Sequence, residues 1–346
     1  MVSAKREMSK RFGLWAIAAI VLVLLATGCG SKANDGGASE SPAAGGSSQA
    51  ASESPAASES PADGQTRLVK HAMGETEVPA SPQRVVVLTN EGTEALLALG
   101  VKPVGAVKSW TGDPWYDHIK DKMEGVTVVG DESQPNLELI ASLKPDLIIG
   151  NKMRQEKIYS QLSAIAPTIE SETLRGEWKN NFKLYAEAIG KKEEGDKLVA
   201  DFDARIEDFK SKAGDKLKET VSVIRFMAGK VRVYNQDTFT GIIFNQIGIA
   251  RNPMTLNSKD AFAEEITKER LPETDSDRLF YFTYETGDGK ATELEKEWTN
   301  DPLWKSLRAV KNGKVYRVDD ATWNTAGGIL AANKLLDDLY KIYEVN

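Results

Sequence analysis

The stretch EEGDKLVADFDARIEDFKSK, residues 193–212, decides how the rest of the chain is organised. Its apolar residues recur three or four positions apart, which predicts a helix with one apolar face. About twenty residues at 1.5 Å each would make a rod of roughly 30 Å, without the proline or glycine-rich crossover of a flexible hinge. The stretch is therefore predicted to be a rigid connection. The apolar residues at this spacing are Leu198, Phe202, Ile206 and Phe209.

Short apolar strands alternate with helical segments on both sides of this helix. This alternation is typical of parallel βαβ units whose helices cover both faces of a sheet. The sequence therefore predicts an α/β fold, with two Rossmann-like lobes bridged by a single long helix at 191–216. The lobes are expected at 67–190 and 217–346. Strands are predicted at 84–89, 104–107, 126–129, 146–149, 167–169, 221–226, 231–234, 279–282 and 315–318, and further helices at 94–99, 136–143, 155–165 and 329–343.

The first residues have the pattern of an export signal. Four basic residues between positions 5 and 11 precede an apolar run at 14–25, which is too short to span a bilayer comfortably but suits a signal peptide. The run ends in LATGC, residues 25–29, which resembles a bacterial lipobox, although Ala26 stands where that motif usually has leucine. The resemblance implies removal of residues 1–28 and lipidation, such as palmitate, at Cys29. The alternative is an ordinary buried cysteine beside an uncleaved signal.

Residues 29–66 have the composition of a disordered tether. They consist mostly of serine, alanine, glycine, proline and acidic residues, and SESPA recurs at 39–43, 52–56 and 58–62. Such a segment has too few apolar groups to offset the entropy lost on ordering. It is predicted to hold a folded domain away from a membrane surface.

Composition excludes several classes of site. The 346 residues contain one cysteine and two histidines, His71 and His118, so neither a disulfide framework nor a protein-ligated transition metal is expected. The net charge of −7 argues against a nucleic-acid partner. The chain has no G-x-S-x-G, P-loop or H-E-x-x-H motif, so an enzyme is not predicted. A lipid-anchored hydrolase is the alternative from a different class.

The chain contains the motifs VVGDESQPNLE at 128–138, PDLII at 145–149, DPLW at 301–304 and DDATWNTAGG at 319–328. These motifs, the last of them most specifically, resemble those of the iron-siderophore and vitamin B12 binding proteins of ABC importers. The resemblance extends from about Arg67 to the C-terminus. It implies a ligand cleft between two lobes and a monomer lipid-anchored on the extracytoplasmic face of the cell membrane. Its partners would be an ABC permease with its ATPase, and its ligand a ferric siderophore; cobalamin or haem is the alternative within the same fold.

A siderophore already surrounds Fe³⁺ with its own oxygens, so no cofactor and no metal ligand from the protein is expected. The cleft needs cations for residual negative charge and aromatic rings for the apolar shell of the chelate. Arginine suits this task because its guanidinium stays charged and offers a planar fork to oxygen atoms. From the ends of strands and from the resemblance, the predicted ligand-binding residues are Arg154, Arg175, Trp178, Arg225, Tyr234, Trp323 and Asn324.

Two further expectations come from the resemblance. Relatives that bind carboxylate siderophores carry several arginines in the loop at 320–326, where this chain is neutral or acidic. A ligand of low net charge is therefore predicted, either a hydroxamate or a citrate–hydroxamate siderophore. Glu138 and Glu269 match the acids, one on each lobe, that dock into the permease. The alternative is that each acid only favours the start of a helix.

Overall fold

The computed structural model describes residues 65–345. The predictions for the signal peptide, for Cys29 and for the tether up to residue 64 lie outside the described residues. Within 65–345, no helix combines the length and the apolar character needed to cross a bilayer.

The first lobe contains a five-stranded, fully parallel sheet in the order β5-β4-β3-β6-β7. Counted from β3, this is the order 3-2-1-4-5 of a doubly wound sheet, which reverses direction between β3 and β6. Ligands of such sheets bind beyond the carboxyl ends of the strands at this reversal. The strands are β3 Val85–Val87, β4 Gly105–Ala106, β5 Thr127–Val128, β6 Leu147–Asn151 and β7 Thr168–Ser171.

The helices of this lobe differ from the sequence prediction at two places. The helix expected at 94–99 begins at Asn90, because the Thr89 side chain caps it by accepting the backbone N–H of Gly92 at 3.1 Å. The segment expected as one helix at 155–165 is divided into separate turns. The helices are α1 Asn90–Ala98, η1 Lys120–Lys122, α2 Leu137–Ser142, α3 Lys152–Gln155, η2 Glu156–Ile158, α4 Tyr159–Ile165 and α5 Trp178–Ala188.

A hairpin that sequence reasoning missed opens the described chain. Its strands are β1 Thr66–His71 and β2 Gly74–Pro79, and they form a separate antiparallel sheet beside β7. Only one residue of each strand is fully buried, Val69 in β1 and Val78 in β2. The apolar signal was therefore too sparse to indicate strands.

The second lobe has a mixed sheet in the order β10-β9-β8-β11-β12. The strands β8, β11 and β12 are parallel, but β9 is antiparallel to both β8 and β10, so the expected all-parallel arrangement is wrong here. Only Ala228 and Gly229 connect β8 to β9, and so short a connection permits only an antiparallel pair. The strands are β8 Val221–Met227, β9 Lys230–Tyr234, β10 Ala263–Ile266, β11 Arg278–Tyr284 and β12 Val315–Arg317.

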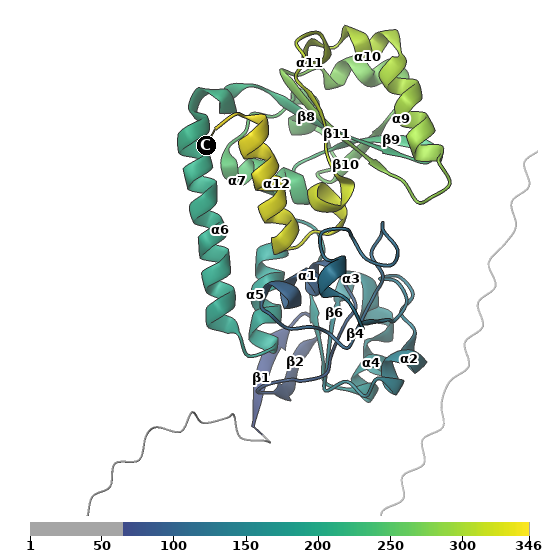
Figure 1. The fold of residues 1–346 in the computed structure, drawn as a ribbon, viewed down its shortest axis with the longest axis vertical. Helices are drawn as coiled ribbons and strands as arrows, with labels where there is room; N and C mark the ends of the chain where they lie inside the picture. Colours follow the sequence, from purple (N-terminus) through teal and green to yellow (C-terminus); the bar gives the residue numbers. More distant parts are fainter. Residues whose placement is uncertain (1–64, 346) are drawn as a thin grey trace, which may run out of the picture. The chain divides into compact units, whose positions relative to one another are not determined.

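The helices of the second lobe cover this sheet (Figure 1). The turn at Ala321–Thr325 is a short π-helix, and it leads into the last helix of the chain. The helices are η3 Gly214–Lys218, α7 Phe239–Ile247, α8 Pro253–Asn257, η4 Lys268–Thr274, α9 Lys290–Asn300, α10 Pro302–Ser306, α11 Arg308–Lys311 and α12 Ile329–Ile342.

The long helix α6, Lys192–Ala213, connects the lobes as its periodicity predicts. Phe202, Ile206 and Phe209 on its apolar face are completely buried. The helix packs against α5 of the first lobe and against α7 and α12 of the second (Figure 1). The predicted fold class, two α/β lobes and one long helix, is confirmed.

Candidate functional site

A cavity of about 400 Å³ is lined by residues of both lobes. This volume is within the range of small-molecule binding sites. Its first-lobe wall includes Glu91, which follows β3, and Arg154, which follows β6. The wall thus lies where the parallel sheet reverses its strand order, as topology leads one to expect.

Arg154 holds one cation at this wall. Its Nε lies 3.4 Å from Oε2 of Glu132, and its guanidinium lies 5.7 Å from the centre of the Trp110 ring. The other oxygen of Glu132 accepts two hydrogen bonds of 2.8 Å, from the backbone and side chain of Asn90. Glu132 is buried, whereas 37% of the Arg154 side chain is exposed. The guanidinium can therefore turn to a ligand while Glu132 remains anchored.

Glu91 is a second buried carboxyl group in the same wall. Its Oε1 accepts hydrogen bonds of 2.7 Å from the Asn181 side chain and from the Tyr185 hydroxyl, both on α5. Burial raises the pKa of Glu91 to about 8, the two hydrogen bonds oppose this rise, and the nearby Glu132 and Glu94 add to it. Glu91 is therefore largely protonated at neutral pH.

The second-lobe wall contains a closed ion pair between Arg225 of β8 and Asp320. The Arg225 Nε lies 2.6 Å from Asp320 Oδ1, and Nη2 lies 3.0 Å from Oδ2, so the contact is bidentate. Nη1 donates to the Tyr234 hydroxyl at 2.8 Å, and the guanidinium lies 4.5 Å from the centre of the Tyr284 ring. Both charged side chains are buried, and burial raises the pKa of Asp320 although Arg225 opposes this rise. This network fixes the guanidinium in place.

Two more arginines add positive charge to the cavity. Arg232 lies directly opposite Arg225 in the antiparallel pair of β8 and β9, so both side chains are on the same face. Like charges at opposite positions destabilise a strand pair unless they are compensated, and Asp320 compensates only Arg225. Among residues 65–345, Arg232 has no ion-pair partner. Arg175, in the loop before α5, is exposed and lies 4.7 Å from the Phe262 ring centre. These two guanidinium groups are available for an anionic ligand.

Six of the predicted ligand-binding residues line this one cavity. They come from five separate segments of the chain, and three of them, Trp178, Arg225 and Tyr234, are buried in its walls. The set is Arg154, Arg175, Trp178, Arg225, Tyr234 and Asn324.

Trp323 requires a correction, because it does not line the cavity. Its side chain is completely buried, with its ring centre 5.0 Å from that of Phe280 and 6.0 Å from that of Phe244. Its Nε1 donates to the Asp338 carboxylate at 3.0 Å. The π-helical turn directs Trp323 into the core, while the following Asn324 lines the cavity.

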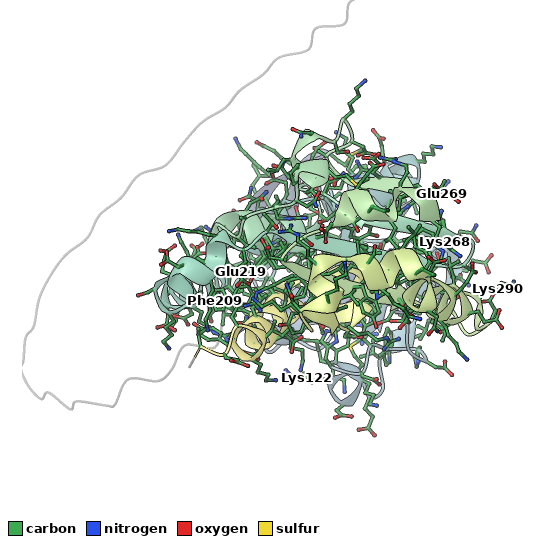
Figure 2. The ribbon with its side chains drawn as sticks, turned by 90° about the horizontal axis from the view of Figure 1, so that it is seen from above. Lys122, Phe209, Glu219, Lys268, Glu269 and Lys290 are labelled. Atoms are coloured by element: carbon green, nitrogen blue, oxygen red, sulfur yellow. The ribbon has the colours of Figure 1, made fainter. Side chains whose placement is uncertain are left out.

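The predicted docking acids lie on the surface, away from the cavity lining. Glu138 is exposed in the first turn of α2, whose start is capped by Asn136. Glu269 is exposed in the first turn of η4, and Figure 2 shows it next to Lys268 at one edge of the view. One acid therefore belongs to each lobe.

Sequence reasoning missed several residues of the cavity wall. Glu91 could have been found because it follows a buried strand at the reversal of a doubly wound sheet. Arg232 could not, since its place opposite Arg225 depends on the register of β8 and β9. The residues missed include Glu91, Glu132, Arg232, Asp237, Phe262 and Tyr284 in the lining, together with Asp320 behind Arg225.

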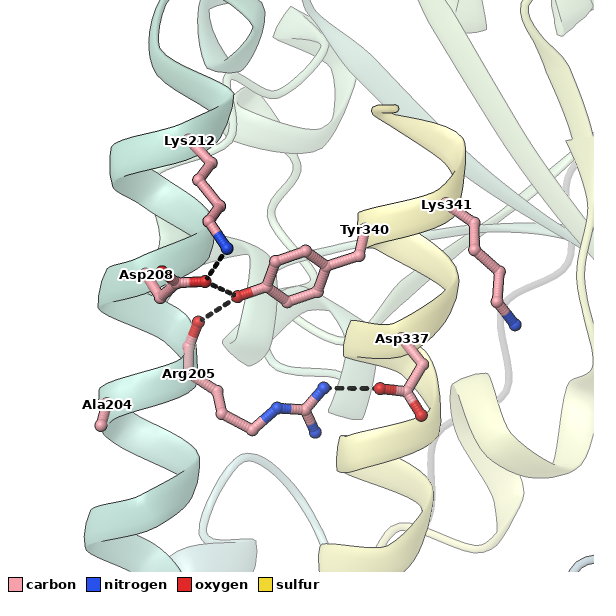
Figure 3. Close-up of a pocket in the computed structure, with 7 residues that line it drawn as sticks. All are labelled: Ala204, Arg205, Asp208, Lys212, Asp337, Tyr340 and Lys341. Carbon is pink, nitrogen blue, oxygen red and sulfur yellow. Dashed lines mark hydrogen bonds and ion pairs between the residues drawn. The ribbon is translucent and has the colours of Figure 1, made fainter. Parts of the chain in front are cut away.

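A second hollow, of about 660 Å³, lies between α6 and α12 (Figure 3). Four of its five charged side chains are paired across the two helices or within α6: Arg205 contacts Asp337, and Asp208 contacts Lys212, whereas Lys341 has no ion-pair partner within residues 65–345. The Tyr340 hydroxyl of α12 also donates to Asp208 at 2.6 Å. This hollow therefore fastens the bridging helix to α12 and offers little free charge to a ligand.

The described chain also offers no cluster of metal ligands. Between residues 65 and 345, no three histidine, cysteine, aspartate or glutamate side chains are arranged to hold a metal ion. What the cavity offers instead is guanidinium groups and aromatic rings.

Comparison with known protein families gives one match over most of the described chain. Residues 85–322 match the family described as periplasmic binding protein. The chain is 56% identical over 282 residues to the probable siderophore-binding lipoprotein YfiY of Bacillus subtilis, covering 80% of this chain and 87% of that protein. It is 33% identical to the Fe(3+)-citrate-binding protein YfmC of the same organism, covering 95% and 96%.

Solved structures show the same fold. Staphylococcus aureus SirA complexed with staphyloferrin B superimposes with a TM-score of 0.74 and 39% identity, covering 81% of this chain and 99% of that one. The Bacillus subtilis protein FeuA complexed with ferri-bacillibactin gives a TM-score of 0.69 at 25% identity, with coverage of 80% and 98%.

Proposed function

Because the chain belongs to the periplasmic binding protein family, we propose that it captures a ferric siderophore outside the cytoplasm and delivers it to an ABC import permease. The observation that carries this proposal is the lining of the cavity between the lobes. Four arginines and six aromatic side chains line it, and among the described residues no side-chain cluster is suited to bare iron. The aromatic residues are Trp110, Trp178, Tyr234, Phe239, Phe262 and Tyr284.

The chemistry of the ligand explains this lining. A siderophore occupies the coordination sphere of Fe³⁺ with its own oxygens, so the protein recognises the outside of the chelate. Arg175 and Arg232 can donate to peripheral oxygens, and the rings of Trp110 and Phe262 can cover apolar parts of the chelate. Because the protein would supply no iron ligand, capture and release would not require a change in iron coordination.

The balance of charge supports a ligand of low net charge. The lining arginines are Arg154, Arg175, Arg225 and Arg232, and Glu132 and Asp320 neutralise two of them. A triply charged catecholate complex would need a denser positive patch. We therefore propose a hydroxamate or a citrate–hydroxamate siderophore.

The names of the relatives favour a citrate unit in that ligand. YfmC is named for Fe(3+)-citrate, and another relative, FecB of Escherichia coli, is named for Fe(3+) dicitrate. A single citrate carboxylate could be held by Arg175 and Arg232, the two cavity arginines that have no ion pair within residues 65–345. The hydroxamate arms could then lie against the aromatic residues.

The remaining parts of the chain complete the proposal. Residues 1–28 would be the signal peptide, Cys29 the lipidated residue and 29–66 the tether of a monomeric lipoprotein at the extracytoplasmic face of the cell membrane. Residues 67–190 and 217–346 would be the two lobes, joined at 191–216. The exposed Glu138 and Glu269 would dock the lobes onto the permease, to which the ATPase is attached. Binding and delivery would involve no catalytic turnover and no resident cofactor.

A fluorescence titration tests the proposed ligand class, because Trp110 and Trp178 lie in the cavity wall. The soluble domain would be titrated with ferric citrate bis-hydroxamate, ferrioxamine B, ferric citrate, a ferric triscatecholate, cyanocobalamin and haemin. We expect saturable quenching by a hydroxamate or citrate–hydroxamate complex at submicromolar concentration. Tight binding of the triscatecholate with none of the hydroxamates would overturn the ligand class. Binding of cobalamin or haem alone would overturn the siderophore function.

A further inference from the structure

The capture of an anionic chelate does not explain why the buried Glu91 lines the cavity. A carboxylate there would repel the ligand and would itself be costly to bury. Glu91 nevertheless lines the cavity with only 7% of the residue exposed. A residue so placed needs either a cation as partner or a proton.

Within residues 65–345, Glu91 has no ion pair with a cationic side chain. On its own helix the nearest charged group is Glu94, which pairs with His118 and accepts the backbone N–H of Ala331 at 2.9 Å. From the loop before α2 it faces Glu132, whose own cation is Arg154. From α5 it meets Asn181 and the Tyr185 hydroxyl. From the second lobe it meets Gly327, which carries no charge. The charges around Glu91 are therefore negative.

Hydrogen bonding decides where the proton would lie. Oε1 of Glu91 already accepts two hydrogen bonds, from Asn181 and Tyr185, and cannot also carry a proton without losing one. Oε2 has no hydrogen-bond partner within residues 65–345. Oε2 is also not fully enclosed by protein atoms, because it is absent from the buried polar atoms that have no partner. A proton on Oε2 would therefore be available to a molecule in the cavity.

A comparison with Glu132 indicates which of the two buried carboxyl groups carries the proton. Both carboxyl groups are buried in the same wall, but Glu132 has a guanidinium at one oxygen and two donors at the other. Burial raises the pKa of Glu132 as well, but these donors and the Arg154 guanidinium oppose that rise, so Glu132 is stabilised as an anion better than Glu91. If Glu91 and Glu132 hold one proton between them, that proton resides on Glu91. The rise in the pKa of Glu91 to about 8, caused first by burial, agrees with this placement.

We propose that Glu91 contacts the ferric siderophore as a neutral carboxylic acid, donating a hydrogen bond from Oε2 to a ligand oxygen, so that ionisation of Glu91 weakens capture. This inference rests on the proposed function of the cavity. The ionised form would lack the donor and add a negative charge against the ligand. Affinity is therefore highest where Glu91 is protonated and falls as the pH rises above about 8. Binding in that range is accompanied by uptake of a proton.

Glu91→Gln is the matched variant, because glutamine keeps the shape, can accept from Asn181 and Tyr185, and donates from its amide without titrating. Ferric citrate bis-hydroxamate would be titrated by fluorescence into wild type and variant from pH 6 to pH 9.5. We expect wild-type affinity to fall by up to about tenfold for each pH unit above the transition. The variant should bind like wild type at pH 6 and keep that affinity at pH 9.5. Any titration of the chelate itself cancels in the comparison.

Three outcomes separate the two proposals. Equal pH profiles for the wild type and Glu91→Gln, or loss of binding by the variant at pH 6 with an unchanged unfolding curve, would overturn the role of Glu91 alone. Failure of the wild type to bind any ferric chelate at any pH would overturn the proposed function and, with it, this inference. Calorimetry in two buffers of different ionisation enthalpy gives a readout that does not depend on the variant. It should show proton uptake on binding near pH 8.5 for the wild type, and its absence there would refute the role of Glu91.

Discussion

The two walls of the cavity handle buried charge in opposite ways. In the second lobe, Arg225 and Asp320 satisfy each other through two contacts, and the Tyr234 hydroxyl accepts from the same guanidinium. In the first lobe, the buried Glu91 and Glu132 have one ion-pair partner between them within residues 65–345, Arg154, which contacts Glu132. The second-lobe wall therefore presents a fixed charge, whereas the charge of the first-lobe wall can change with one proton. A binding site can thus combine a rigid half that positions the ligand with a half that responds to pH.

The largest effect on stability is expected from removing the counter-ion of Arg225 in the second-lobe wall. Asp320→Ala leaves the buried Arg225 without its counter-ion, and loss of one partner of a buried pair typically costs about 3–5 kcal/mol. The free energy of unfolding measured in urea should fall by that order. The double variant Arg225→Met with Asp320→Ala removes both charges and should recover most of the loss. An unfolding midpoint of Asp320→Ala equal to that of the wild type would contradict the stabilising role of the contacts between Arg225 and Asp320.

The next largest effect is the pH dependence of stability that Glu91 of the first-lobe wall causes in the absence of ligand. Burial raises the pKa of Glu91 from its ordinary value of 4.5 to about 8, so between these values the unfolded chain loses a proton that the folded chain keeps. Wild-type stability should therefore decline with rising pH across this window, relative to Glu91→Gln, by up to about 1.4 kcal/mol per pH unit. Urea unfolding of both proteins at pH 5 and pH 8 measures the difference. A constant difference between them would show that Glu91 titrates normally in the folded state.

A smaller effect is expected from Arg232, which has no ion pair in the described part of the chain. Arg232→Gln should weaken binding of ferric citrate bis-hydroxamate by about tenfold, which corresponds to losing one charged hydrogen bond of about 1.4 kcal/mol. Stability should remain the same or rise slightly, because the variant relieves repulsion with Arg225. Lys230→Gln on the same strand removes an equal charge outside the cavity lining and serves as the control. Equal affinities of the two variants would exclude a ligand contact by Arg232.

The smallest effect on the isolated domain is expected from its two surface acids. Glu138→Arg combined with Glu269→Arg should leave ligand affinity within about twofold of wild type, because both residues are exposed and outside the cavity lining. Siderophore uptake by cells should nevertheless fall sharply if each lobe docks through its acid. Intact uptake by this double variant would remove the docking role from both residues.

The sequence predicted well those features that depend on local patterns. The periodicity of Phe202, Ile206 and Phe209 was sufficient to place the bridging helix, since a buried helical face has only one period. Arg225 could be singled out because a charge inside an apolar strand requires a partner. That partner is Asp320, which lies 95 positions further along the chain, so the strand itself could not identify it.

Features that depend on register or on an irregular turn could not be predicted. Arg232 lies opposite Arg225 in the cavity lining only because β9 pairs antiparallel with β8, which a parallel arrangement would not provide. Trp323 and Asn324 are neighbours in the chain, yet the π-helical turn places the first in the core and the second in the cavity wall. The family motif pointed to a segment that reaches the cavity but could not determine which of its side chains lines it.

One measurement tests most directly whether the protein recognises a pre-formed iron complex. Equilibrium dialysis of the soluble domain would compare radiolabelled iron supplied as ferric citrate bis-hydroxamate with the same iron supplied as ferric nitrilotriacetate, a weak donor from which side-chain ligands could take the metal. The account predicts that the protein retains iron and siderophore together in equal amounts and takes up no iron from the weak donor. Retention of iron without either chelator, together with no binding of the siderophore complex, would contradict it.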